Sequence, residues 1–332
     1  MKIGILSFAH LHAESYIQIL QAAPGVELLG LADEDRERGA RFAQQFGARF
    51  FDSYEALLAE KPDGVLVCSE NNRHRPLVEL AAQAGAHVLC EKPLATRLED
   101  ARAMIEACER AGVSLMTAFP MRFSAPVLEV KTRLAAGDLG QVYCFNAVNQ
   151  GKHPGKLRAW FVDQELAGGG AVFDHTVHLA DLMRWFLGSE VSEVYAQTNR
   201  IIHAGEVEVE TGGLVMLTFE NGVFASIDCS WSRPHYWPTW GGLGFELVTE
   251  RGAVLVDAFR QNLTVYRPDL QRPVWSYWGS NNDAAMIAEF LAALREGRSP
   301  SVTGADGLRA VEIALAAYRS AESGQPVRVE RV

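Results

Sequence analysis

Two segments that lie far apart in the sequence carry residue types that can move a proton to or from a hydroxyl group. Lys92 follows an apolar run, and Asp174 and His178 follow a triple glycine at residues 168–170. Positions four apart face the same side of a helix, so Asp174 and His178 can act together. A histidine titrates near neutral pH and suits proton transfer, and a nearby lysine can stabilise a developing alkoxide. The two segments therefore predict one proton-handling site.

Each of these residues also has an ordinary structural interpretation. Lys92 could be an exposed lysine at a strand end, since lysine is rarely buried. Asp174 and His178 could be a helical pair that contributes only about 0.2–0.5 kcal/mol. His175 lies three residues before His178, so these two histidines and Asp174 make a metal site conceivable. No cluster of acidic or thiol partners completes such a site, and we expect no metal.

Composition and charge exclude several classes of protein. A chain of 332 residues with 48% hydrophobic residues exceeds what one core usually sustains, so we expect two domains. The net charge of -10, without a long basic run, argues against a nucleic-acid partner. Five scattered cysteines argue against both a disulfide framework and a zinc knuckle. No apolar run reaches the roughly 18 residues of a membrane span, and we expect a cytoplasmic protein.

The first 120 residues alternate short apolar runs with helical patterns that end at glycine. This alternation is typical of βαβ units and predicts a doubly wound parallel sheet. We therefore expect an α/β Rossmann domain over residues 1–120. Its strands are expected at residues 2–6, 26–32, 64–68, 87–90 and 114–118.

After Pro120 the pattern changes to longer alternating segments joined by short turns such as Glu220-Asn221-Gly222. Such neighbours predict a mostly antiparallel open sheet. Helices are expected to pack on it, so residues 121–332 should form an α+β domain for substrate binding and oligomerisation. These helices are expected at about 170–187, 283–296 and 304–323.

The turn after the first strand departs from the usual dinucleotide pattern. Glycines in Gly-x-Gly-x-x-Gly permit a tight turn and a close approach of backbone to pyrophosphate. Here the small residues Ser7 and Ala9 still permit that approach, and a helix N-terminus behind them still favours an anion. His12 replaces the last glycine, either as a half-buried helix residue or beside a His10 that contacts pyrophosphate or substrate. The expected cofactor contacts in this turn are Ser7, Phe8, Ala9 and His10.

Asp33 ends the second strand, where a carboxylate accepts hydrogen bonds from a ribose diol and repels a 2'-phosphate. This favours NAD over NADP. Arg36 and Arg38 follow closely and could reverse the preference, or could simply belong to a solvated helix face. A polar cluster follows the strand at residues 64–68, at the edge where ligands bind in open α/β sheets, although helix capping is an alternative role. Its expected cofactor contacts are Ser69, Asn71 and His74.

Several short motifs occur together in an order and spacing that resemble one family. They are Glu91-Lys92-Pro93, Asn71 with His74, Met121-Arg122-Phe123, the triple glycine with Asp174 and His178, and the tail segments at residues 303–310 and 320–327. Jointly they resemble the Gfo/Idh/MocA oxidoreductases, the group of glucose-fructose oxidoreductase and inositol dehydrogenase. The resemblance covers nearly the whole chain.

The resemblance implies an NAD(P)-dependent oxidoreductase that acts on a secondary alcohol of a sugar, cyclitol or related polyol. It assigns Lys92 to the nicotinamide ribose and the substrate hydroxyl, and Glu91 to Lys92 or the cofactor. It assigns proton transfer to His178, which Asp174 orients. Two alternatives stay open. One is a redox-neutral enzyme with tightly bound NAD, of the epimerase, eliminase or glycosidase type, and the other is a cofactor-free sugar-sensing protein.

Aromatic residues concentrate in the second half of the chain, where they could stack on a sugar or bury against another subunit. They are Trp231, Tyr236, Trp237, Trp240, Trp275, Tyr277 and Trp278. We favour the subunit interface for most of them and expect a homodimer or homotetramer formed through the second sheet. Better candidates for the substrate pocket lie in the loop before the triple glycine: Lys152, His153, Arg158 and Trp160. Arg122 could also bind substrate, or could anchor the junction between the domains.

Overall fold

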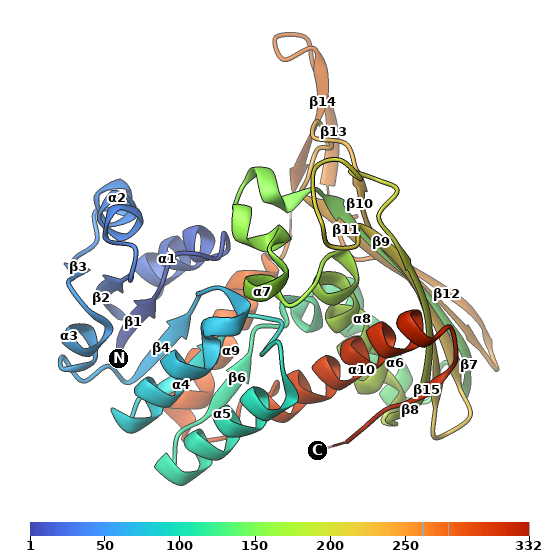
Figure 1. Cartoon of the computed structure of the whole chain (residues 1–332), viewed down its shortest axis with the longest axis horizontal. Coiled ribbons are helices and arrows are strands. Elements are labelled where there is room, and N and C mark those ends of the chain that lie inside the picture. The colour runs from blue at the N-terminus through green and yellow to red at the C-terminus, as the bar shows by residue number, and fades with distance from the viewer. Residues whose placement is uncertain (261, 278, 332) are drawn as a thin grey trace.

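The first of the two large β-sheets is six-stranded and entirely parallel, which confirms the predicted Rossmann architecture (Figure 1). The computed structural model describes residues 1–260, 262–277 and 279–331. The strands follow the order β3-β2-β1-β4-β5-β6. Strands β1 and β4 lie side by side at the centre, and each half of the sheet extends outwards from one of them. The short β3 was not predicted. The bounds are β1 Lys2–Leu6, β2 Glu27–Ala32, β3 Phe50–Phe51, β4 Gly64–Val67, β5 His87–Cys90 and β6 Leu115–Thr117.

Capping side chains mark where helices between these strands begin, and glycine marks where one of them ends. Asp35 accepts a hydrogen bond from the Arg38 amide and caps α2, while Gly47 ends that helix in a left-handed conformation at φ 62°. Ser53 caps α3 in the same way through the Ala56 amide. The helices are α1 Ala13–Ala22, α2 Arg36–Phe46, α3 Tyr54–Leu58, α4 His74–Gln83 and α5 Leu98–Ala111.

The second sheet has seven strands in the order β12-β11-β7-β10-β9-β8-β15. Strands β7 and β10 pair in parallel, and the other neighbours pair antiparallel, as the predicted mostly antiparallel sheet requires. Gly222, at φ 85°, lies in the predicted tight turn between β9 and β10. The bounds are β7 Val142–Lys152, β8 Val191–Asn199, β9 Gly212–Phe219, β10 Phe224–Arg233, β11 Gly241–Thr249, β12 Gly252–Asp257 and β15 Val327–Arg328.

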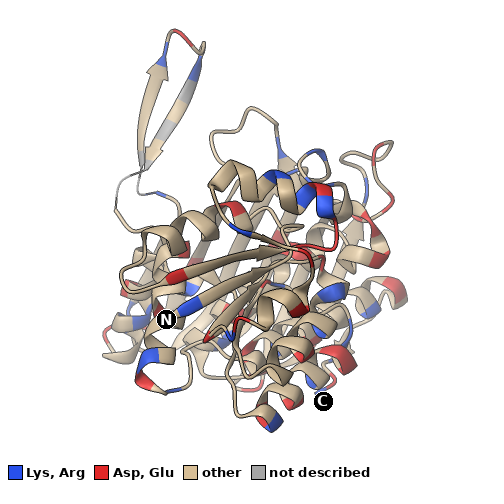
Figure 2. Ribbon diagram, turned by 90° about the vertical axis from the view of Figure 1, so that its left-hand side faces the viewer, with Lys and Arg blue, Asp and Glu red and all other residues tan. Residues whose placement is uncertain are grey.

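A two-stranded hairpin extends away from the body of the protein (Figures 1 and 2). It consists of β13, Asn262–Arg267, and β14, Arg272–Tyr277, and the second of these strands was not predicted. Trp278, named above among the aromatic residues, lies outside the described residues. Figure 2 also shows acidic and basic residues interspersed along the chain rather than gathered on one element.

Helices fill the space between the two sheets, and one of them packs where it was not expected. The buried face of α9 joins the core of the first sheet and lies against α1, so its predicted packing on the second sheet is wrong. Periodicity shows which face of a helix is buried but not which partner buries it. No helix in the described part of the chain is both long and apolar enough to cross a membrane. The α-helices after residue 120 are α6 Ala125–Ala135, α7 Gln164–Ala167, α8 Ala171–Leu187, α9 Asn282–Glu296 and α10 Gly304–Ser323.

Arg122 lies at the start of the second half of the chain and ties that segment to two helices of the same half. Its guanidinium donates to both oxygens of Asp181 on α8, at 2.7 and 2.5 Å, and to Asp306 at the start of α10, at 2.9 Å. A further donor bonds the Ser301 carbonyl oxygen at 3.2 Å. The structure thus favours the anchoring role for Arg122 over substrate binding, because its hydrogen-bond donors are already engaged within the protein.

We expect Arg122→Met to lower the free energy of unfolding by about 3–5 kcal/mol, because it leaves the buried Asp181 carboxylate without its partner. Chemical denaturation of the two proteins measures the difference. The control is Arg133→Met, which removes an exposed pair with Glu129 on α6 and should change stability by no more than about 0.5 kcal/mol. Equal losses in both variants would contradict the anchoring role.

Candidate active site

The structure brings together two residues that are 82 positions apart in the sequence. Lys92 follows β5 of the first sheet, and its Nζ donates to Asp174 Oδ1 on α8 at 2.5 Å. The Lys92 and Asp174 side chains are only 4% and 12% exposed. Burial acts to raise the pKa of Asp174, but Lys92 and His175 together outweigh it, and the pKa lies well below its ordinary value. The pair is therefore a buried ammonium–carboxylate contact between the two halves of the molecule.

The triple glycine determines where α8 begins. A Cβ atom on Gly169 would collide with the Tyr318 hydroxyl, and one on Gly170 would collide with the Glu210 carbonyl oxygen. The Glu210 carboxylate also accepts hydrogen bonds from the Gly170 and Val172 amides, at 3.0 and 2.9 Å. The first turn of α8 can therefore lie close to these neighbours, and this position brings Asp174 to Lys92.

His178 lies one turn after Asp174 and is nearly buried, with its ring 6.1 Å from that of Phe119. Burial lowers its pKa well below the ordinary value of 6.5, and the positive charge of Lys92 lowers it further. Its Nδ1 atom has no hydrogen-bond partner among the described residues. A neutral imidazole that is buried and unpaired at one nitrogen is suited to accept a proton.

Asp174 does not orient His178 by a hydrogen bond in the described structure, contrary to the sequence-based expectation. Its carboxylate instead bonds Lys92 and lies 3.3 Å from Nε2 of His175. The Nδ1 atom of His175 donates to the Asn149 carbonyl oxygen on β7 at 2.8 Å. His175 thus ties the helix to the second sheet, a role that the sequence did not reveal because it depends on a strand 26 residues away.

The turn after β1 forms without glycines. Ser7 takes the left-handed conformation, at φ 70°, that favours glycine. Its hydroxyl accepts a hydrogen bond from the Ala9 amide at 3.2 Å, and the Phe8 amide donates to Asp33 at 2.8 Å. The Phe8 ring is fully buried and lies 5.0 Å from that of Phe42. The Phe8 side chain is therefore not placed for the expected cofactor contact.

Arg38, rather than Arg36, interacts with the carboxylate at the end of β2. Its Nε and Nη2 atoms donate to the two oxygens of Asp33 at 2.9 and 2.7 Å. Arg36 instead forms an exposed pair with Asp52. The expected ribose acceptor Asp33 is therefore already paired with a cation that could itself contact a 2'-phosphate.

The polar cluster after β4 makes contacts within the protein but leaves three buried polar atoms, one of them Asn72 Oδ1, without a partner among the described residues. Asn71 donates through Nδ2 to the Ala167 carbonyl oxygen at 2.8 Å, and the Ser69 hydroxyl donates to the Glu70 carbonyl oxygen. His74 Nδ1 lies 3.0 Å from the Leu94 carbonyl oxygen. Asn71 Oδ1 and His74 Nε2 are buried without hydrogen-bond partners among the described residues.

A segment of the second half of the chain covers the turn after β1. Trp160 donates through Nε1 to the Ala9 carbonyl oxygen at 3.0 Å, and Arg158 donates to Glu14 at 2.6 Å. Trp160, an expected substrate contact, therefore lies on the dinucleotide turn. Another expected contact, His153, lies edge-to-face against His203, with ring centroids 4.6 Å apart.

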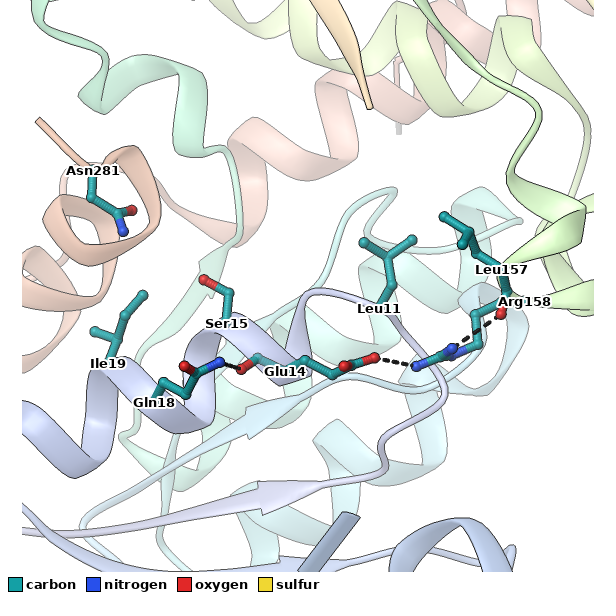
Figure 3. Close-up of a pocket in the computed structure, with 8 residues that line it drawn as sticks. All are labelled: Leu11, Glu14, Ser15, Gln18, Ile19, Leu157, Arg158 and Asn281. Carbon is teal, nitrogen blue, oxygen red and sulfur yellow. Dashed lines mark hydrogen bonds and ion pairs between the residues drawn. The ribbon is translucent and has the colours of Figure 1, made fainter. Parts of the chain in front are cut away.

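A cleft of about 500 Å³ lies beside α1 (Figure 3). The ion pair between Glu14 and Arg158 belongs to its lining, with α1 on one side and Asn281 on the other. The cleft is not lined by Lys92 or Asp174, so it is distinct from the ammonium–carboxylate contact. Its lining residues are Leu11, Glu14, Ser15, Gln18, Ile19, Leu157, Arg158 and Asn281.

Comparison with known proteins identifies the class to which this fold and site belong. Residues 2–119 match an oxidoreductase family with an NAD-binding Rossmann fold, and residues 127–255 match the GFO/IDH/MocA C-terminal domain. The chain is 30% identical to D-apiose dehydrogenase of Paraburkholderia graminis, over 98% of this chain and 88% of that protein. It is 29% identical to 1,5-anhydro-D-fructose reductase of Ensifer adhaerens, over 98% of both chains.

A solved structure agrees over the full length. GenD2 from gentamicin A biosynthesis, in complex with NAD, matches with a TM-score of 0.89 and 25% identity, over 100% of this chain and 97% of that chain. The chain belongs to the Gfo/Idh/MocA oxidoreductases. The predicted family, fold class and NAD cofactor are confirmed.

The residues at the edge of the first sheet fit a dinucleotide. The buried polar atoms without a hydrogen-bond partner among the described residues include Asn71 Oδ1, His10 Nε2 and His178 Nδ1. They lie after β4, after β1 and on α8, where the two halves of the chain meet. Buried polar groups normally have partners, so these atoms indicate that a polar ligand completes the site.

We expect Asp33→Ser to raise the preference for NADP over NAD by roughly 10- to 100-fold, because Arg38 is then free to bind the 2'-phosphate. The ratio of kcat/KM for the two cofactors measures the change. Asp52→Ser is the matched control, since it frees the exposed Arg36 instead and should leave the ratio unchanged. An unchanged ratio in Asp33→Ser would show that neither Asp33 nor Arg38 contacts the adenosine ribose.

Proposed function

We propose that this protein transfers a hydride between NAD and a secondary alcohol of a sugar, cyclitol or related polyol, with NADP as a possible second cofactor. The buried contact between Lys92 and Asp174, one helical turn from a neutral His178, carries the proposal. Relatives named as a D-apiose dehydrogenase, a 1,5-anhydro-D-fructose reductase and a myo-inositol 2-dehydrogenase support this substrate class.

In the proposed reaction, Lys92, Asp174 and His178 have distinct roles. Oxidation of the alcohol breaks its C–H and O–H bonds and leaves a ketone, and NAD, when bound, supplies the acceptor for the hydride. His178 accepts the hydroxyl proton, and Lys92 donates a hydrogen bond to the substrate oxygen as negative charge develops on it. Asp174 holds the ammonium group in place and can accept a hydrogen bond from a neighbouring hydroxyl. Glu91 accepts a hydrogen bond from the Lys92 amide at 3.1 Å and so steadies the lysine.

A redox-neutral enzyme with permanently bound NAD is the second candidate, and one observation favours it. The segment around Trp160 covers the turn after β1 through bonds from Trp160 to Ala9 and from Arg158 to Glu14. A cofactor bound beneath this segment could leave only after these bonds break. The sensor alternative rested on the missing glycines, and Ser7 supplies the conformation that the turn needs without them.

We further propose that residues 1–120 bind the cofactor and that residues 121–332 provide the substrate and oligomerisation surfaces. One face of the second sheet exposes apolar side chains, as a homodimer or homotetramer interface would require. A cytoplasmic location agrees with five unpaired cysteines, which a reducing compartment preserves. The exposed apolar residues on this face include Val148, Leu214, Met216 and Phe224.

We expect Lys92→Ala to lower kcat for polyol oxidation by at least about 100-fold, because the developing alkoxide loses its hydrogen-bond donor. NADH binding, followed by cofactor fluorescence, should persist and so show that the fold is intact. Lys131→Ala removes a partly buried lysine that bonds the Trp185 carbonyl oxygen outside the site, and it should leave kcat unchanged. Full turnover by Lys92→Ala would remove this lysine from the mechanism.

We expect kcat/KM for oxidation to stay at its maximum at pH values just below 6.5 and to fall only when the solution becomes more acidic still. Burial is the main cause of the low pKa of His178, and Lys92 adds to it, so the base stays neutral where an ordinary histidine is protonated. Of the other nearby charges, Asp174 raises this pKa, whereas His175 and His12 lower it. A pH–rate profile provides the measurement, with His178→Gln as the variant that should lose the acidic limb. An acidic fall in kcat/KM that is already centred at or above pH 6.5 would contradict His178 as the base.

A further inference from the structure

Two histidines from the turn after β1 converge on the carboxylate that follows β5. Nδ1 of His12 lies 3.0 Å from Glu91 Oε1, and Nδ1 of His10 lies 3.6 Å from the same oxygen. Possible ligand atoms of all three residues lie within 4.8 Å of one another. The His10 and Glu91 side chains are 1% exposed and that of His12 is 24% exposed. The group is thus almost fully enclosed, with one member reaching solvent.

The spacing of these atoms suits a small divalent ion. Zinc binds imidazole nitrogen and carboxylate oxygen at about 2.0–2.2 Å, so neighbouring ligands in a tetrahedral site lie about 3.4 Å apart. The two distances in this group, 3.0 and 3.6 Å, lie on either side of that value. Small side-chain movements would therefore be enough to bind an ion.

We propose that His10, His12 and Glu91 bind one divalent transition-metal ion, with Zn²⁺ as the preferred ion. Imidazole ligands select zinc, copper, nickel or iron over magnesium and calcium. Two histidines and one glutamate are also a donor set of catalytic zinc sites, which keep a fourth position for water or a ligand oxygen. Two histidines and one glutamate thus suit a zinc ion that has three protein ligands and a fourth position for water or a ligand oxygen.

Neighbouring groups already hold the three proposed ligands in place. The Lys92 amide donates to Glu91 Oε2 at 3.1 Å and leaves Oε1 directed at the histidines. The ring of His10 lies 5.2 Å from that of Phe161, and the Tyr16 hydroxyl lies 3.4 Å from His12 Nδ1. A hydrogen bond to the ligating carboxylate, as from the Lys92 amide, is typical of metal sites, and metal binding at His12 Nδ1 would replace the Tyr16 contact. Without an ion, His10 Nδ1 accepts a long hydrogen bond of 3.2 Å from the His12 amide, which metal binding would replace.

This proposal goes beyond hydride transfer and gives a physical reason for the altered turn. His12 replaces the last glycine of the usual dinucleotide pattern, and an ion held there would add positive charge where a pyrophosphate binds. The sequence predicts no metal at Asp174, His175 and His178. It does not indicate that His12 and Glu91 lie together, because 79 residues separate them.

The proposal is tested by titrating metal-free, full-length protein with Zn²⁺ by calorimetry and with Co²⁺ by visible absorption. We expect one ion per chain and a Co²⁺ spectrum typical of tetrahedral N/O coordination. His12→Gln and Glu91→Gln should each weaken Zn²⁺ binding by at least about 100-fold, since even the loss of a supporting group typically costs 10- to 100-fold. Circular dichroism of each variant checks that it folds.

His203→Gln is the matched control, because it disrupts the other group that could hold an ion, His153, His203 and Glu206. It should leave Zn²⁺ binding unchanged. The proposal is overturned if the wild type binds no ion, if His12→Gln binds as tightly as the wild type, or if binding is lost only in His203→Gln. NADH binding is measured on the same samples, so a failure of the oxidoreductase function can be distinguished from a failure of the metal site.

Discussion

The structure depends on a buried contact between an ammonium group that follows the first sheet and a carboxylate on the helix that covers the second. Two isolated charges in this position would cost several kcal/mol each, and only good geometry offsets that cost. The 2.5 Å contact between Lys92 and Asp174 meets this requirement. It holds only if α8 begins close to Glu210, which the glycines at 169 and 170 allow. The triple glycine and the lysine are therefore parts of one constraint, although they lie in different halves of the chain.

The turn after β1 shows how a dinucleotide site can be built from other residues. Ser7 supplies the left-handed backbone conformation, and Asp33 fixes the Phe8 amide while it is itself paired with Arg38. The same edge carries the carboxylate–guanidinium pair of Asp33 and Arg38 and, at its other end, a histidine. The conformation of the turn therefore does not require the glycines of the usual pattern.

Much of the fold and the principal pair could be predicted from the sequence, because local patterns and motif order determine them. Alternating runs indicate strands, glycines end helices, and Lys92 and Asp174 belong to motifs that are recognisable through their joint order and spacing. The rest depends on contacts between distant elements. Periodicity could not show that α9 packs on α1, or that Arg122 is bonded to Asp181 on α8. Nor could spacing show that His175, rather than His178, lies against the Asp174 carboxylate.

The most direct measurement is a crystal structure of the protein with NAD and an unreactive polyol bound. The account predicts one substrate hydroxyl oxygen within about 2.7–3.2 Å of both Lys92 Nζ and a ring nitrogen of His178, with the nicotinamide ring against the adjacent carbon. A polyol bound away from these two side chains, with Lys92 still paired only with Asp174, would contradict it.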